Sequence, residues 1–272
     1  MANLGADFSG GFMRRLYVAS NPAGLGWALG IVAMLLLFNV VLQTIFGAVA
    51  AIGIVGGEFG DPRQAIKGLM IGIFPAGVLT LLGAWVLART RGGVPLEVLS
   101  LRRPALSASG WSLVIGGFVV CMYGVIMLIV LVFGIDVTQY TPGPDGQSPE
   151  TGSVGLVKEA MFDLANEPLL FWLVLPAVGI GAPLAEEVIF RGQLFSALSQ
   201  TRLGFSGTAV ITSLAWSGLH LSEPWFAVGI IFVMGLALAW MLYRFGSLWV
   251  TIAAHGAWNT LYSFIIFGFS PQ

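Results

Sequence analysis

Five ionisable side chains lie in stretches of this chain that are otherwise hydrophobic enough to span a membrane. They are Glu186, Glu187, Arg191, His220 and His255. A charge at the centre of a bilayer costs about 3 kcal/mol or more, so such residues indicate a functional site with partners of its own. Together with Asn259 they supply two carboxylates, two imidazoles, a guanidinium and an amide. These are the groups of a hydrolytic centre.

The acidic pair and the arginine form the first pattern. Glu187 and Arg191 are four residues apart, so on a helix they share a face and can form an ion pair. We expect this pair to orient Glu186, which points about 100° away around the helix. The alternative is a charge pair that only joins two helices, which would leave Glu186 without a purpose. Pro176 and Pro183 lie upstream and predict a weakened helix just before the carboxylates.

The two histidines of the chain form the second and third patterns. His220 follows Trp216 by four residues, and His255 precedes Asn259 by four. One turn of helix brings the imidazole of His255 and the amide of Asn259 to the same face. An amide can donate to a developing oxyanion without carrying charge. The alternative is that these groups form hydrogen bonds between helices and do no chemistry.

The composition describes a membrane protein. Hydrophobic residues make up 57% of the chain and charged residues 9%, against about 25% charged residues in a soluble domain. This excludes a water-soluble fold. The net charge of −1 gives no indication of nucleic-acid binding. The single cysteine, Cys121, excludes an internal disulfide and a CxxC metal site.

The apolar runs predict an all-α, polytopic membrane bundle of about seven transmembrane helices, with eight as the alternative. About 20 apolar residues are needed to cross the hydrocarbon core. The first run, Leu25 to Gly56, is too long for a signal-peptide core and predicts a retained helix. The predicted spans are Leu25–Val55, Gly68–Ala88, Ala108–Phe133, Pro168–Leu198, Phe205–Leu221, Pro224–Tyr243 and Ser247–Phe267.

The chain divides into four predicted regions. Residues 1–24 form a cytoplasmic N-terminal segment, 25–134 the N-terminal transmembrane helices, 135–167 an external loop, and 168–268 the core that holds the motifs. In the loop, residues 154–164 have apolar residues at helical spacing, which predicts either an amphipathic helix on the membrane surface or a loop helix packed on the bundle.

Basic residues in the loops predict the orientation. Eight arginines fall on the side of the N-terminus, whereas only Arg63, Lys67 and Lys158 fall on the other. The positive-inside rule therefore places the N-terminus in the cytoplasm. At about 1.5 Å per helical residue, the motif side chains lie about 12–23 Å from the cytoplasmic face. The three motifs can therefore meet near the middle of the bilayer.

In order and spacing, the three motifs resemble those of the CPBP family of intramembrane proteases. This is the CAAX protease and bacteriocin-processing family, which includes the type II CAAX prenyl endopeptidases. Its Glu-Glu-x-x-x-Arg, Phe-x-x-x-His and His-x-x-x-Asn motifs match residues 186–191, 216–220 and 255–259, within about 168–268. The departure is Trp216, where the family usually has Phe. We expect Trp216, Phe190 and Trp258 to line the substrate cleft.

The resemblance implies an endopeptidase with a cavity open to the cytoplasm. It implies that Glu186 is the general base that activates water, with help from His220. It further implies that His255 and Asn259 hold the oxyanion, and that Glu187 and Arg191 organise the site. The implied partners are the lipid bilayer and a membrane-anchored or lipidated protein, such as a prenylated CAAX protein, with no nucleic acid. The implied location is the cytoplasmic (inner) membrane of a prokaryote.

Alternatives remain open on the cofactor and on the function. Glu186, His220 and His255 could hold Zn²⁺ with an open position for water, but no His-Glu-x-x-His helix is present. The site therefore needs either no cofactor or Zn²⁺. A non-catalytic scaffold or bacteriocin-immunity protein with the same fold is one rival function. A small-solute or ion transporter is another, although the sequence shows no inverted repeat. The sequence does not identify the substrate.

Overall fold

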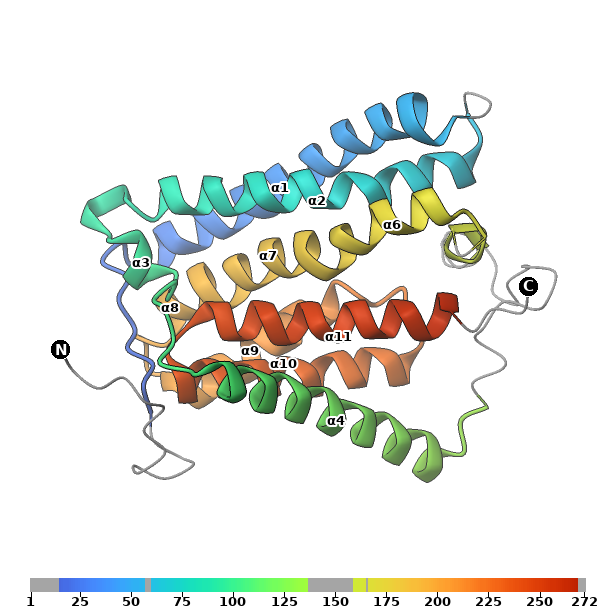
Figure 1. Cartoon of the computed structure of the whole chain (residues 1–272). Coiled ribbons are helices and arrows are strands. Elements are labelled where there is room, and N and C mark those ends of the chain that lie inside the picture. The colour runs from blue at the N-terminus through green and yellow to red at the C-terminus, as the bar shows by residue number, and fades with distance from the viewer. Residues whose placement is uncertain (1–14, 57–59, 137–158, 165, 269–272) are drawn as a thin grey trace.

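The chain forms a bundle of helices (Figure 1). The computed structural model describes residues 15–56, 60–136, 159–164 and 166–268, with side chains to residue 264, and these ranges contain no strand. Within these ranges, five segments are long and apolar enough to cross a membrane: Leu25–Val55, Pro62–Leu87, Ala108–Phe133, Pro168–Leu198 and Trp225–Phe245. The predicted all-α, polytopic membrane fold is confirmed.

Three long helices come first along the chain. Helix α1 (Leu25–Ala50) continues into the π-helical turn η2 (Ala51–Val55), and α2 (Pro62–Leu87) returns along it. The short η3 (Thr90–Gly92) and α3 (Pro95–Val98) then lead to α4 (Ala108–Phe133). Ser107 caps α4 by accepting a hydrogen bond from the backbone of Gly110, and Gly134 ends it in the left-handed conformation. Helix α4 lies at the edge of the bundle (Figure 1).

Helix α2 begins six residues before the predicted span Gly68–Ala88. Asp61 caps it through a hydrogen bond from the Arg63 backbone, and Pro62 occupies its first position. The charges of Arg63 and Lys67 hid this first turn in the sequence. Both find acidic partners in space, through contacts of Arg63 with Glu159 (2.6 Å) and Asp163 (3.8 Å) and of Lys67 with Glu167 (2.7 Å) and Asp163 (3.4 Å).

These partners belong to the predicted external loop. Residues 159–164 are helical, whereas residues 154–158 of the predicted amphipathic segment lie outside the described residues. Ala160 and Leu164 are fully buried, and Leu164 packs with Met70 of α2 and with Leu170 and Val174 of the following helix. The described part of this segment is therefore a loop helix packed on the bundle.

The fourth span alternates between α-helical and π-helical geometry. It comprises α6 (Pro168–Pro176), η5 (Ala177–Gly181), α7 (Ala182–Glu187), η6 (Val188–Leu194) and α8 (Phe195–Leu198). Segment η5 starts directly after Pro176 and ends two residues before Pro183, where the sequence predicts a weakened helix. π-Helical turns are rare and frequently mark functional sites. Here the acidic pair ends α7, between the two π-helical segments.

Three more helices complete the bundle: α9 (Gly204–Gly218), α10 (Trp225–Phe245) and α11 (Leu248–Gly268). Helices α9 and α11 correspond to two predicted spans that are not among the five long, apolar segments. Helix α9 has 15 residues, fewer than the about 20 that cross a bilayer. Helix α11 has 21 residues but carries the polar side chains of the third motif.

Glycines allow the fourth span to approach α2 and α11 at backbone distance. A Cβ atom on Gly77 of α2 would collide with the carbonyl oxygen of Gly181, and one on Gly256 of α11 would collide with that of Gly179. Segment η5 is therefore held between two helices by close backbone contact. This contact fixes the height of the acidic pair relative to the third motif.

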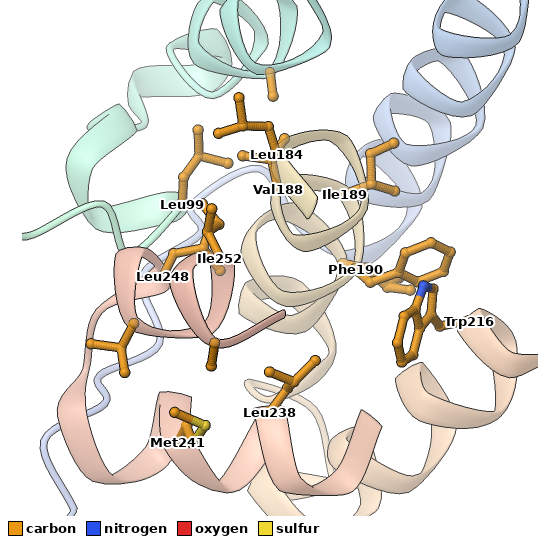
Figure 2. Close-up of a cluster of buried hydrophobic side chains, with 14 of the residues drawn as sticks. Leu99, Leu184, Val188, Ile189, Phe190, Trp216, Leu238, Met241, Leu248 and Ile252 are labelled. Carbon is orange, nitrogen blue, oxygen red and sulfur yellow. The ribbon is translucent and has the colours of Figure 1, made fainter. Parts of the chain in front are cut away.

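A buried apolar cluster surrounds η6 (Figure 2). Helices α10 and α11, the loop after α3 and Trp216 of α9 pack against it. The labelled side chains are Leu99, Leu184, Val188, Ile189, Phe190, Trp216, Leu238, Met241, Leu248 and Ile252. Such an environment strengthens any hydrogen bond made inside it and makes an unpaired polar group costly.

Candidate active site

Glu187 is the centre of a fully buried polar network. Its Oε1 accepts one hydrogen bond from Arg191 Nη1 at 3.0 Å and one from His255 Nδ1 at 3.1 Å. The side chains of Glu187 and Arg191 have no solvent exposure. A carboxylate can only accept, so Nδ1 of His255 must carry a proton. Glu187 thus fixes the ring of His255 and leaves its Nε2 facing Glu186, 3.9 Å from Oε2.

The positive charge of Arg191 is stabilised by an aromatic ring as well as by Glu187. Its guanidinium carbon lies 4.2 Å from the centre of the Trp216 ring, a cation–π contact that is strongest when both groups are desolvated. Within the described part of the chain, Nε and Nη2 of Arg191 and Oγ of Ser213 are buried without a hydrogen-bond partner. Gly235 of α10 makes room for both groups, because a Cβ there would lie 2.7 Å from Ser213 Oγ and 3.1 Å from Arg191 Nη2.

Glu186 lies in a different environment from its neighbour. Its side chain is 27% exposed, and its Oε2 accepts a hydrogen bond from the indole Nε1 of Trp216 at 2.6 Å. The sequence suggested Trp216 as a cleft residue. The structure places it behind Glu186, where it is 1% exposed. An indole N–H can hold a carboxylate, whereas the phenyl ring usual in the CPBP motif cannot.

The two histidines are oriented in the same way. His220 Nδ1 lies 3.1 Å from the backbone oxygen of Trp216, and because a carbonyl only accepts, Nδ1 carries the proton. Each histidine therefore uses Nδ1 for orientation and keeps Nε2 for other partners. The ring of Trp216 meets both imidazoles edge-on, with centroids 5.7 Å from His220 and 5.2 Å from His255.

Glu186 and His220 line one cavity of about 440 Å³. Of the predicted cleft residues, Phe190 also lines it, whereas Trp216 and Trp258 do not. Its lining residues are Leu36, Leu37, Asn39, Val40, Gln43, Ala185, Glu186, Ile189, Phe190, Leu219 and His220. Helix α1 forms one wall, and the fourth span with the end of α9 forms the other.

Sequence reasoning missed the two amides of this wall. Asn39 and Gln43 carry no charge, so a search for ionisable residues in apolar runs passes over them. The available signal was two amides one helical turn apart in an otherwise apolar span. Gln43 Nε2 donates to Asn39 Oδ1 at 2.7 Å, and Asn39 Nδ2 donates to Thr80 Oγ1 of α2 at 2.9 Å.

The third motif is divided between the site and the scaffold. His255 reaches Glu186, but Nδ2 of Asn259 donates to the backbone oxygen of Val178 in η5 at 3.0 Å. Trp258 is buried, and its ring stacks on Tyr262 and contacts Tyr123 of α4. Asn259 therefore joins α11 to the π-helical turn, and it is not among the residues that line the cavity.

The donors of the predicted zinc site do not converge. Among the described residues, no group of three or more His, Cys, Asp or Glu side chains is arranged to hold a metal ion. Nδ1 of both histidines is engaged, by Trp216 and by Glu187. Glu186 Oε2 is 3.9 Å from His255 Nε2, the distance of a weak polar contact between the two groups. Both histidines keep Nε2 free, as histidines that ligate metals do, so the expectation of a metal-free site rests on the spacing of the three donors alone.

The part of the chain that matches known proteins is the part that contains the three motifs. Residues 168–261 match the family model described as type II CAAX prenyl endopeptidase Rce1-like. This confirms the resemblance that the motifs indicated. The match covers about a third of the chain, from the start of α6 into α11, and leaves out α1 and its amides. No curated protein and no solved structure matches the chain.

Proposed function

We propose that this protein is an intramembrane endopeptidase that hydrolyses a peptide bond of a membrane-associated protein, with Glu186 as the general base. One observation carries the proposal: of two adjacent carboxylates, Glu186 alone opens on the cavity, which His220 also lines, and Trp216 holds Glu186 in place. The family match over residues 168–261 supports the reaction class.

The proposed reaction uses water as the nucleophile. Glu186 takes a proton from a water molecule in the cavity while the water oxygen attacks the scissile carbonyl carbon. The tetrahedral oxyanion forms beside Nε2 of His220 and His255, which stabilise it when they carry a proton. Glu186 then returns the proton to the amide nitrogen, the C–N bond breaks, and the products are a carboxylate and an amine.

The cavity lining supports a membrane-associated substrate. Its apolar side chains, among them Leu36, Val40 and Leu219, suit a peptide that reaches the site from the bilayer. A prenylated CAAX protein is the candidate named by the family. The positive-inside pattern supports a cytoplasmic N-terminus, and we propose that the cavity opens to that side, in the inner membrane of a prokaryote.

A comparison of peptide termini tests the proposal and requires no assumption about the substrate. Membranes from cells with equal amounts of wild-type protein, Glu186→Gln or Glu97→Gln are compared by terminal proteomics. Glu97→Gln is the matched control, because Glu97 is a partly exposed carboxylate paired with Arg102, outside the cavity. We expect new termini with the wild type and Glu97→Gln only. Identical termini in all three would contradict proteolysis and favour the non-catalytic scaffold.

A second experiment addresses the cofactor. We propose a metal-independent base, because the candidate zinc ligands do not converge. Purified wild-type protein is then expected to contain no stoichiometric zinc and to stay active after chelation. Stoichiometric zinc that is lost in His220→Ala would overturn this part of the proposal and leave the endopeptidase assignment in place.

A further inference from the structure

The amide pair of α1 lies in the cavity wall opposite the proposed base. Asn39 and Gln43 line the cavity on one side, and Glu186 and His220 line it on the other. Amides inside an otherwise apolar membrane span need an explanation. The common one is a hydrogen bond to another helix.

That explanation accounts for Asn39 and leaves Gln43 unexplained. Asn39 donates to Thr80, which belongs to α2 and is fully buried, so this bond joins two helices. Gln43 donates to Asn39 one turn away on its own helix. Its carbonyl oxygen and second N–H make no further hydrogen bond to the described part of the chain. Gln43 therefore offers the cavity one acceptor and one donor, in a plane fixed by Asn39.

An acceptor and a donor on one amide match the polar groups of a peptide main chain. A substrate segment must be extended for its peptide bond to reach Glu186, so its N–H and C=O groups have no helical partners. In an apolar cavity each unpaired group costs about 1–3 kcal/mol. The cavity residues beside Gln43 on α1, Leu36, Leu37 and Val40, can donate or accept nothing through their side chains.

We propose that Gln43 binds the main chain of the extended substrate segment, opposite Glu186, and that Asn39 is the positioning residue that orients the Gln43 amide. The proposal rests on the endopeptidase function and names its substrate-binding element. It assigns a specific role to α1, which lies outside the segment matched by the family model.

Kinetics on a synthetic farnesylated peptide that ends in a CAAX sequence test the proposal. Gln43→Leu removes the amide and keeps an apolar side chain. If Gln43 binds ground state and transition state alike, KM rises by about tenfold, the effect of one or two lost hydrogen bonds, while kcat changes little. Gln43→Glu keeps an acceptor but loses both N–H groups, including the one that donates to Asn39 Oδ1, so we expect a rise in KM at least as large as that of Gln43→Leu.

Two matched variants separate binding from helix packing. Thr80→Val removes the bond between α1 and α2 outside the cavity. Thr44→Val removes an exposed hydroxyl of α1 that bonds only to its own helix. We expect Thr80→Val to lower the melting temperature with less effect on KM than Gln43→Leu, and Thr44→Val to change neither. An unchanged KM in Gln43→Leu, or equal effects of Thr80→Val and Gln43→Leu on KM, would overturn the proposal.

A binding measurement keeps this test independent of catalysis. A photoreactive residue in place of Val40, in the Glu186→Gln background, captures the same peptide whether or not cleavage occurs. Gln43→Leu should reduce the cross-linked yield about tenfold at subsaturating peptide. If the peptide is cross-linked but the wild-type protein does not cleave it, the endopeptidase function would be contradicted, whereas the role of Gln43 in binding would stand. If no peptide is cross-linked whether residue 43 is Gln or Leu, the proposed binding site would be contradicted.

Discussion

Glu186 and Glu187 are adjacent in the sequence and lie in two regions of opposite character. The buried network, Glu187 with Arg191 and His255, is sealed from solvent and uses its hydrogen bonds internally. The cavity face, Glu186 with His220, opens on a volume of about 440 Å³ bordered by α1. Trp216 belongs to both regions, since its ring covers Arg191 and its N–H holds Glu186.

This contrast assigns different work to similar side chains. A buried ion pair contributes little net stability compared with apolar residues, but losing one partner is costly. The buried network is therefore a device for orientation: it fixes the ring of His255. The partly exposed carboxylate of Glu186 keeps access to water, which a general base needs. Substitutions should separate the two regions by the property that they change.

Loss of the cavity-face carboxylate should give the largest change in activity. Glu186→Gln removes the base and keeps a side-chain oxygen that can accept from Trp216. We expect the cleavage rate to fall by about 10²–10⁴-fold, with an unchanged melting temperature in detergent. A cleavage rate within a few-fold of the wild type would contradict the contrast between the two carboxylates, because Glu186 would then have no chemical role.

Loss of the buried carboxylate should change stability first. Glu187→Gln leaves the buried charge of Arg191 uncompensated, which costs about 3–5 kcal/mol in the free energy of unfolding. Chemical denaturation in micelles measures this loss. The double variant Glu187→Met with Arg191→Met removes both charges and should recover part of the stability. This double variant should be inactive, because His255 has lost the carboxylate that orients its ring. Full stability of Glu187→Gln would contradict the role of the network.

The residue shared by both regions should have an intermediate effect. Trp216→Phe keeps an aromatic ring beneath Arg191 and loses the N–H that holds Glu186. A hydrogen bond to a charged group contributes about 1.5–3 kcal/mol, so we expect kcat to fall about 10–100-fold with little change in stability. Site-specific replacement by 3-benzothienylalanine, which has the indole shape without the N–H, should give the same fall. Wild-type kcat in that variant would show that the N–H is not required.

The smallest effect should come from crowding the network without removing a polar group. Gly235→Ala places a Cβ against Ser213 and Arg191, and such overpacking costs about 1–3 kcal/mol of unfolding free energy. Gly229→Ala is the control on the same helix, because no heavy atom lies within 4 Å of its added Cβ. Equal stability of the two variants would indicate that the side chains around Arg191 are not tightly packed.

The sequence predicted the helical bundle and the meeting of the three motifs, because apolar length and charge inside apolar runs are local signals. It also predicted the Glu187–Arg191 pair from helical spacing. It did not reveal which side of α1 faces the fourth span, because that depends on packing between helices distant in sequence. Asn39 and Gln43 were missed because they carry no charge, and Trp216 was expected in the cleft because an aromatic residue in a motif does not indicate which way its ring points.

The most direct test measures cleavage rate and melting temperature on the same purified samples of wild type, Glu186→Gln and Glu187→Gln. We predict that Glu186→Gln has a much lower cleavage rate and an unchanged melting temperature, whereas Glu187→Gln has a lower melting temperature. An active and stable Glu186→Gln, or equal losses of stability in both variants, would contradict the division of labour between the two carboxylates.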